Sequence, residues 1–193
     1  MVMRMLSYSV LLVASAAANA AETRALFDLT VPAAAREWQP VHDRVMGGRS
    51  SGGVTSSDAG IRFSGRLSLA NNGGFASIRS RNSQLNLSNG DTVILSVRGD
   101  GRTYSLNLYP QRRRTAFSFR ASFPTKKDEW TRVEIPLSSF QATSFGRRVR
   151  ISLKPEQITG LGILLGDKKP GPFQIEIRSI AVARGPVAPN SAE

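Results

Sequence analysis

The stretch IRFSGRLSLA, residues 61–70, alternates apolar and polar side chains along its length. One side of the alternation holds Ile61, Phe63, Leu67 and Leu69, and the other holds Arg62, Ser64, Arg66 and Ser68. A period of two residues is the period of a β-strand, whose successive side chains point to opposite faces. The stretch therefore predicts a strand with one face on a core and the other in water.

The same alternation recurs along most of the chain. It is found at residues 92–99, 103–109, 117–123, 131–137 and 173–182. The stretch ITGLGILLGD, residues 158–167, is nearly all apolar and predicts a strand that is buried on both faces. Turn signals rich in glycine and asparagine separate these segments, and short helical turns are expected at 136–140 and 154–158. Eight or more short strands predict an all-β fold, a single β-sandwich or jelly roll.

The composition suits one basic domain. The chain has 193 residues, of which 40% are hydrophobic, and this is enough for one domain with a substantial core. Its formal net charge of +12 favours anionic partners: glycans of an outer envelope, anionic lipids or an acidic protein face. The sequence has no cysteine, which excludes disulfides, thiol catalysis and thiolate metal sites.

The N-terminus has the pattern of an export signal. An apolar run from Leu6 to Ala18 follows an arginine, and the A-x-A triplet that ends at Ala20 marks a cleavage site. The mature protein would then be periplasmic or secreted, with no transmembrane segment and no nucleic-acid partner. The expected divisions are a signal peptide at 1–20, a short segment at 21–25, the sandwich at 26–183 and a disordered tail at 184–193.

No catalytic constellation stands out. A hydrolase would have to use the one histidine, His42, together with the adjacent Asp43. Neighbours in an extended chain point to opposite faces, so their adjacency does not make a catalytic pair. The sequence also has no phosphate-binding glycine loop, no evident pair of carboxylates and no calcium-binding run of acids. We expect a non-enzymatic protein without a cofactor and name no metal ligands, but a calcium ion held by oxygen ligands in a loop, as sandwich domains often have, stays an open alternative.

Three loops combine glycine with polar or charged residues next to the ends of strands. They lie at 44–53, 70–77 and 97–104, and we expect them to gather at one polar end of the sandwich, where binding sites usually form. The candidate binding or signature residues are Asp43, Met46, Gly47, Gly48, Asn71, Asn72, Gly73, Gly74, Arg98, Asp100 and Arg102. A separate candidate for anion binding is the run Arg112, Arg113 and Arg114.

These motifs, taken in order, resemble one known family. The match comprises Asp43, Val45-Met46-Gly47-Gly48, Ser50, Phe63, Gly65, Asn71-Asn72-Gly73-Gly74-Phe75, Arg98-Gly99-Asp100-Gly101-Arg102, Tyr104, Trp130, Val133, Ile135-Pro136, Phe140, residues 162–167, Gly171 and Phe173. Together they resemble the complex I intermediate-associated protein 30 domain over residues 26 to about 182. The resemblance implies a galactose-binding-like β-sandwich with no catalytic residues to carry over. Its founding mitochondrial member is an assembly chaperone that works on the matrix side, whereas this chain has a predicted export signal.

The loops suggest specific local structures. We expect Asp43 to be half-buried and either to accept hydrogen bonds from backbone N–H groups or to pair with Arg98. Met46 would pack beneath the loop as an adaptable apolar filler, and Gly47-Gly48 would make the sharp turn. Asp100 lies between two arginines, which can pair with it and lock a turn.

Three functions follow from these observations. The first is a non-enzymatic binding or assembly-factor-like module of the cell envelope, which binds a protein partner through the loops at one end of the sandwich. The second is a carbohydrate-binding module for an envelope or extracellular glycan, and its aromatic and amide groups at the loops would be Trp38, Tyr104, Asn71 and Asn72. The third is the hydrolase with His42 and Asp43. Trp130 opens an alternating strand and is expected in the core.

Overall fold

Antiparallel strands dominate the protein in this computed structural model, which describes residues 22–111 and 117–184. The strands are β1 (Thr23–Asp28), β2 (Trp38–His42), β3 (Ser51–Ser57), β4 (Gly60–Leu67), β5 (Ala76–Ser80), β6 (Thr92–Arg98), β7 (Thr103–Pro110), β8 (Phe117–Pro124), β9 (Trp130–Pro136), β10 (Gln141–Ser144), β11 (Arg147–Arg148), β12 (Ile158–Leu165) and β13 (Gly171–Ala183). The short 3-10 helices are η1 (Ala34–Glu37), η2 (Asp43–Met46), η3 (Ala70–Asn72), η4 (Leu137–Ser139) and η5 (Pro155–Gln157). These residues include no α-helix, so the all-β prediction is confirmed, as are the two predicted helical turns, η4 and η5.

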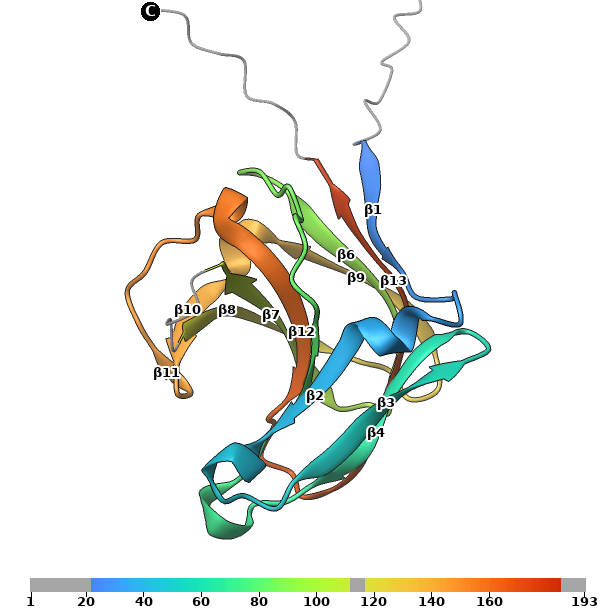
Figure 1. Cartoon of the computed structure of the whole chain (residues 1–193), viewed down its shortest axis with the longest axis vertical. Helices are drawn as coiled ribbons and strands as arrows, with labels where there is room; N and C mark the ends of the chain where they lie inside the picture. Colours follow the sequence, from blue (N-terminus) through green and yellow to red (C-terminus); the bar gives the residue numbers. More distant parts are fainter. Residues whose placement is uncertain (1–21, 112–116, 185–193) are drawn as a thin grey trace, which may run out of the picture.

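Two sheets pack face to face (Figure 1). One has six strands, in the order β3-β4-β13-β6-β9, with β1 added beside β13. The other has seven strands, in the order β11-β10-β8-β7-β12-β5-β2. The sandwich that the alternating sequence predicts is therefore confirmed.

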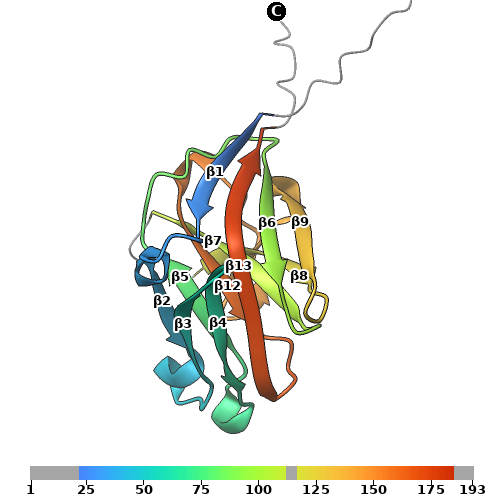
Figure 2. The ribbon, with the colours of Figure 1, turned by 90° about the vertical axis from the view of Figure 1, so that its right-hand side faces the viewer.

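The last strand, β13, holds the six-stranded sheet together (Figure 2). Its first half pairs with β4, its second half with β1, and its other edge with β6. Thr23 at the start of β1 is the register partner of Ala183. The first strand therefore begins before residue 26, where the sandwich was expected to begin.

The core lies between the two sheets and is built from the predicted apolar positions. Ile61, Phe63 and Leu67 are buried as the alternation of residues 61–70 requires, whereas Leu69 is 41% exposed because it lies beyond the end of β4. In β12, Ile163 faces the core, and Leu164 on the opposite face is also buried. This confirms that the apolar strand at 158–165 is buried on both faces.

The seven-stranded sheet is curved, and its outer side is concave (Figure 1). Strands β10 and β11 form one edge and β2 forms the other, while β7 and β12 lie in the middle. Because side chains alternate along each strand, one set of residues fills the core and the next set lines the concave face.

Several expectations concern residues outside the described ranges. These are the signal peptide at 1–20, the tail beyond residue 184, and the run Arg112, Arg113 and Arg114. Within the described ranges, no helix is long and apolar enough to cross a membrane.

Candidate functional site

The first two glycine-rich loops meet around one buried carboxylate. Asp43 is fully buried, and its Oδ1 accepts a hydrogen bond from the backbone N–H of Ser50 at 2.9 Å. Its Oδ2 accepts from the Ser50 hydroxyl at 2.6 Å, from Gly74 N–H at 2.7 Å and from Phe75 N–H at 3.3 Å. Burial alone would raise the pKa of Asp43, but these hydrogen bonds outweigh burial and hold the pKa below its ordinary value.

The glycines of both loops make room for this carboxylate. Gly47 ends η2 with a φ of 85°, which is a left-handed conformation that favours glycine. A Cβ atom at Gly48 would lie 2.5 Å from Oδ1 of Asp43, and a Cβ at Gly73 would lie 2.5 Å from Oδ2. The signature motif is thus a compact hydrogen-bonded cluster around Asp43, in which the two loops pair their own polar groups with one another.

Two details of the expected loop are wrong. Asp43 accepts backbone hydrogen bonds, as one expectation had it, but it is fully buried rather than half-buried and it does not pair with Arg98. Met46 is 58% exposed instead of packing beneath the loop, because the loop interior is filled by the Asp43 carboxylate. Asn71 helps to close the loop, since its side-chain amide donates to Gly47 O at 3.2 Å. Asn71 and Asn72 both adopt positive φ angles.

His42 contacts only backbone groups through its ring nitrogens. Its Nδ1 accepts from the backbone N–H of Ser77 at 3.4 Å, so Nε2 carries the proton that it donates to Gly52 O at 2.8 Å. A general base needs a free ring nitrogen within reach of a nucleophile. The ring of His42 is instead a structural link between β2, β3 and β5.

The third loop joins the same end of the sandwich through a connection that was not predicted. Asp100 locks the turn as expected, but it accepts from Arg102 N–H, the Tyr104 hydroxyl and Gln174 N–H rather than forming ion pairs. The Arg102 guanidinium pairs with Asp167 at 2.7 Å. The residue after Asp167 is Lys168, whose Nζ lies against Gly74 of the second loop. The segment between β12 and β13 therefore connects the third loop to the second, which Asp43 joins to the first.

Arg98 takes part in a different cluster on the outer face of the six-stranded sheet. Glu176 is buried and accepts from Arg62 through one oxygen and from Arg98 through the other. Its two partners hold the pKa of Glu176 below the ordinary value, although burial alone would raise it. Glu176 was not predicted, and its signal was a single acid among the apolar and basic residues of 173–182.

The aromatic residues do not form the expected platform at the loops. Tyr104 is buried because it packs against Phe123 and its hydroxyl binds Asp100, and Trp38 is buried beside Phe27. The prediction that Trp130 lies in the core is also wrong, because its side chain is half-buried on the outer face of the six-stranded sheet. The guanidinium of Arg178 stacks 4.2 Å from the centre of its ring. Arginine, rather than the core, covers this tryptophan.

A row of residues that are polar except for one glycine crosses the concave face, and sequence reasoning did not predict it. The strand registers align Gln39, Arg79, Gly162, Asn107, Arg120 and Gln141 from β2 to β10. We call this set, together with Tyr109, the concave row. These residues come from separate strands, and only the order of the strands in the sheet places them side by side.

The middle of the concave row is hydrogen-bonded and preorganised. Arg120 Nε donates to Asn107 Oδ1 at 3.1 Å, and the Asn107 amide donates to the Tyr109 hydroxyl at 3.1 Å. The ring of Tyr109 lies over Gly162, where a Cβ would be 2.9 Å from the ring. The Arg79 guanidinium stacks 4.5 Å from the centre of the same ring.

The arginines of the concave row have no acidic partner. Burial lowers the pKa of Arg120, and only the nearby Tyr109 opposes this shift. On the six-stranded sheet, by contrast, Arg62 and Arg98 share Glu176. Across the described ranges, neither Arg79 nor Arg120 forms an ion pair with a carboxylate. The concave row therefore presents mainly hydrogen-bond donors and positive charge.

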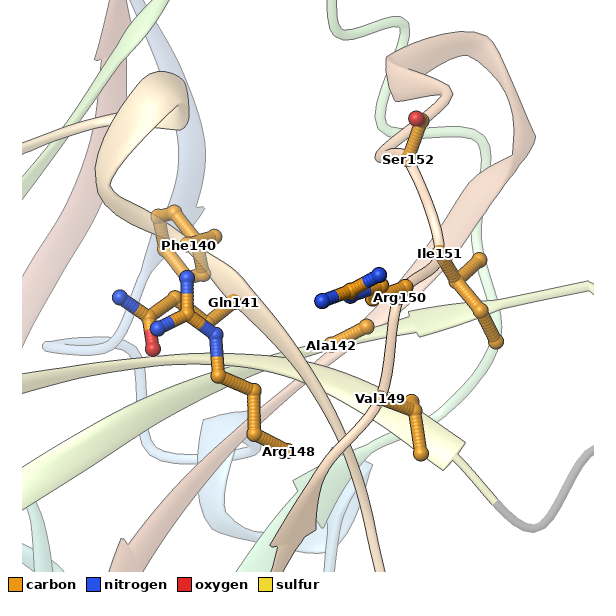
Figure 3. A pocket seen from close by; sticks show the side chains of 8 residues that line it. All are labelled: Phe140, Gln141, Ala142, Arg148, Val149, Arg150, Ile151 and Ser152. Atoms are coloured by element: carbon orange, nitrogen blue, oxygen red, sulfur yellow. The ribbon is translucent and has the colours of Figure 1, made fainter.

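At its β10 end the concave face has a shallow pocket of about 310 Å³ (Figure 3). Gln141 of the concave row lines it, together with Phe140 and the segment 148–152. The residues described in the structure contain no group of three or more histidine, cysteine or acidic side chains that could hold a metal ion.

Comparison with known proteins gives one family and one fold. The sequence model of the family described as Complex I intermediate-associated protein 30 (CIA30) matches residues 27–177. The mouse protein named "Complex I intermediate-associated protein 30, mitochondrial" is 35% identical over 103 residues. This stretch is 50% of the present chain but only 31% of the mouse protein.

Solved structures with a similar fold include carbohydrate-binding modules. A family 11 module from Clostridium thermocellum, in complex with a β-1,3-1,4-mixed-linked tetrasaccharide, superposes with a TM-score of 0.61 at 13% identity, covering 84% of this chain and 96% of the module. The family 11 module of the cellulosomal cellulase Lic26A-Cel5E of the same organism gives a TM-score of 0.61 at 14% identity, covering 89% and 99%. At this level of identity, the likeness establishes a shared β-sandwich fold.

Proposed function

We propose that this chain, which belongs to the complex I intermediate-associated protein 30 family, is a non-enzymatic binding module that holds a carbohydrate chain on its concave face. Its signature loops are closed by their own contacts, so we place the ligand on the concave face and not at the loops. The observation that carries the proposal is the concave row, in which donors without acidic partners lie across the middle strands. Preorganised donors on rigid strands are the usual framework of a specific binding site.

The chemistry of the concave row suits a ligand that is rich in oxygen. The arginines can only donate hydrogen bonds, and Asn107 already uses its amide for Tyr109. A ligand with many hydroxyl or ring oxygens supplies acceptors for such guanidinium donors. Two modules with the same fold are carbohydrate-binding modules, and one was solved with a bound tetrasaccharide. Both facts support a sugar chain as the ligand.

Other parts of the molecule support binding without catalysis. The acceptor oxygens of Asp43 are occupied by the loops themselves, so the signature end offers this carboxylate to no ligand. Both ring nitrogens of His42 contact backbone groups, which argues against the hydrolase hypothesis. If residues 1–20 direct export as their sequence predicts, the ligand is an envelope or extracellular glycan.

A second candidate is an assembly factor that binds a protein. Membership of a family whose mouse relative is named for association with an intermediate of complex I favours it. The tip of the β10–β11 hairpin offers one suitable anchor, since the aromatic ring of Phe145 is 80% exposed. This hypothesis predicts a discrete protein partner whose binding requires Phe145 and not the concave row.

Affinity electrophoresis of the purified protein in gels that contain single polysaccharides would test the carbohydrate proposal. We expect at least one polysaccharide to retard the wild-type protein, and Tyr109→Ala and Arg120→Gln to reduce the apparent affinity by about tenfold. Arg132→Gln is the matched control, because it removes the same charge from an exposed position on the other sheet. Binding that survives both concave-row variants, or that Arg132→Gln weakens equally, would contradict the proposal.

A further inference from the structure

We infer that the pocket at the β10 edge is a subsite for an anionic substituent, so that the preferred glycan bears carboxylate or sulfate groups. The inference rests on the proposed function, because it adds the charge of the ligand to the same concave face. Its evidence is the juxtaposition of two guanidinium groups, from Arg148 and Arg150, in one pocket whose lining contains no acid. We call this pocket the arginine pocket.

The local strand pattern turns both arginines to the same side. Arg148 is paired with Thr143 of β10, and the backbone N–H of Val149 donates to Ala142 O at 2.9 Å. Val149 packs against the core, and in an extended segment its two neighbours point the opposite way. Figure 3 shows the guanidinium of Arg150 in the space between β10 and the segment 149–152, and that of Arg148 beside Gln141. The backbone hydrogen bond fixes this segment, so the backbone places both exposed arginines beside one pocket.

Two positively charged groups that line one pocket would be stabilised by an anion bound between them. Like charges repel one another, and elsewhere on this molecule acids balance neighbouring arginines, as Glu176 does for Arg62 and Arg98. Neither Arg148 nor Arg150 forms an ion pair with any carboxylate of the described ranges. Arginine forms two parallel hydrogen bonds with a carboxylate or a sulfate, which makes such groups its best partners.

The arginine pocket is continuous with the concave row. Gln141 lines the pocket, and in the sheet it is the register partner of Arg120. A sugar chain that contacts Arg120 and extends toward the edge of the sheet therefore reaches Arg148 and Arg150. Phe140 and Ala142, whose side chains are buried in the core, form the floor of the pocket beside them. A neutral chain would leave the two guanidinium groups without a counter-charge.

The test compares polymers that differ only in charge. Polygalacturonate and its fully methyl-esterified form share one backbone, and dextran sulfate and dextran share another. We expect the wild-type protein to bind an anionic member at least tenfold more tightly than its neutral counterpart, and the pair with the larger ratio of affinities identifies carboxylate or sulfate as the preferred group. The double variant Arg148→Gln/Arg150→Gln should lose this preference, and Arg148→Lys/Arg150→Lys should retain part of it.

The control is Arg66→Gln/Arg132→Gln, which removes two charges from exposed positions on the six-stranded sheet. Equal weakening by both glutamine pairs, with full screening by salt, would mean non-specific attraction and overturn the inference. Equal binding of neutral and charged polymers would overturn it while leaving the proposed function intact. Binding of none of the polymers would count against the proposed function. In that case, a rise in melting temperature with sodium sulfate, lost in the glutamine pair, would still support the arginine pocket as an anion site.

Discussion

At the scale of single residues, the buried carboxylate of Asp43 holds two loops together through the hydrogen bonds that it accepts. It is fully buried and receives hydrogen bonds from Ser50, Gly74 and Phe75. Asp43→Ala would leave two buried N–H groups and one partly buried N–H group without an acceptor, and each buried loss costs about 1–3 kcal/mol. We therefore expect the free energy of unfolding to fall by at least about 3 kcal/mol, measured by urea denaturation. Wild-type stability together with loss of a ligand would instead make the loop a binding site.

A matched pair of glycine variants isolates the steric part of this argument. A Cβ at Gly48 collides with the Asp43 carboxylate, whereas a Cβ at Gly53 meets nothing within 4 Å. Gly48→Ala should destabilise the protein by about 2 kcal/mol or more, as overpacked positions do. Gly53→Ala should leave the urea midpoint nearly unchanged. If both variants had the same urea midpoint, close packing around the Asp43 carboxylate would not explain the glycine at position 48.

At the scale of elements, the β10–β11 hairpin has an unfavourable residue at its turn. Ser144 and Arg147 are register partners, and between them Phe145 and Gly146 have φ angles of 46° and 77°. Such turns favour asparagine or glycine, because a left-handed conformation strains other side chains. Phe145→Asn should therefore raise the free energy of unfolding by about 0.5–1 kcal/mol in thermal or urea unfolding. Lower stability in this variant would show that the ring makes native contacts.

How well the sequence predicts an element depends on how its side chains are divided between core and water. Strand β4 was predictable because apolar and polar residues alternate regularly along it. Strand β3, with the sequence SGGVTSS, was not predicted because few apolar side chains reveal its face. The three loops were identified as one polar end, but the acids Asp167 and Glu176 that join distant strands were not. The concave row was also unpredictable, since its residues become neighbours only through the order of strands in the sheet.

At the scale of the whole molecule, the buried carboxylates of Asp43 and Glu176 and the half-buried one of Asp167 link stability to pH. Burial alone would raise the pKa of Asp43, Asp167 and Glu176. Hydrogen bonds lower each pKa by more than burial raises it, and arginine partners add to this lowering for Asp167 and Glu176. The pKa of each carboxyl group therefore lies below its ordinary value. The unfolded chain therefore takes up protons at a higher pH than the folded chain. Their stabilisation is complete above the unfolded pKa of about 4 and is lost as pH falls through the lower folded values.

The expected result is a free energy of unfolding that changes little through these three groups between pH 7 and about pH 5 and declines below about pH 4.5. Urea denaturation at a series of pH values measures it. Glu176→Gln should make the acid decline shallower, because the substituted side chain no longer titrates. A stability that increased on acidification through this range would refute the assignment of the three carboxylates.

The position of β13 has a consequence for the order in which the chain can fold. The six-stranded sheet is closed by its last strand, which contacts β1, β4 and β6 at once. A chain made or threaded from its N-terminus presents β1, β4 and β6 long before their common partner arrives. Until residue 183 is available, these strands have unpaired edges, and folding must wait for contacts between the two ends of the sequence. Such a chain remains open, and exposed to aggregation, until the residues of β13 have emerged.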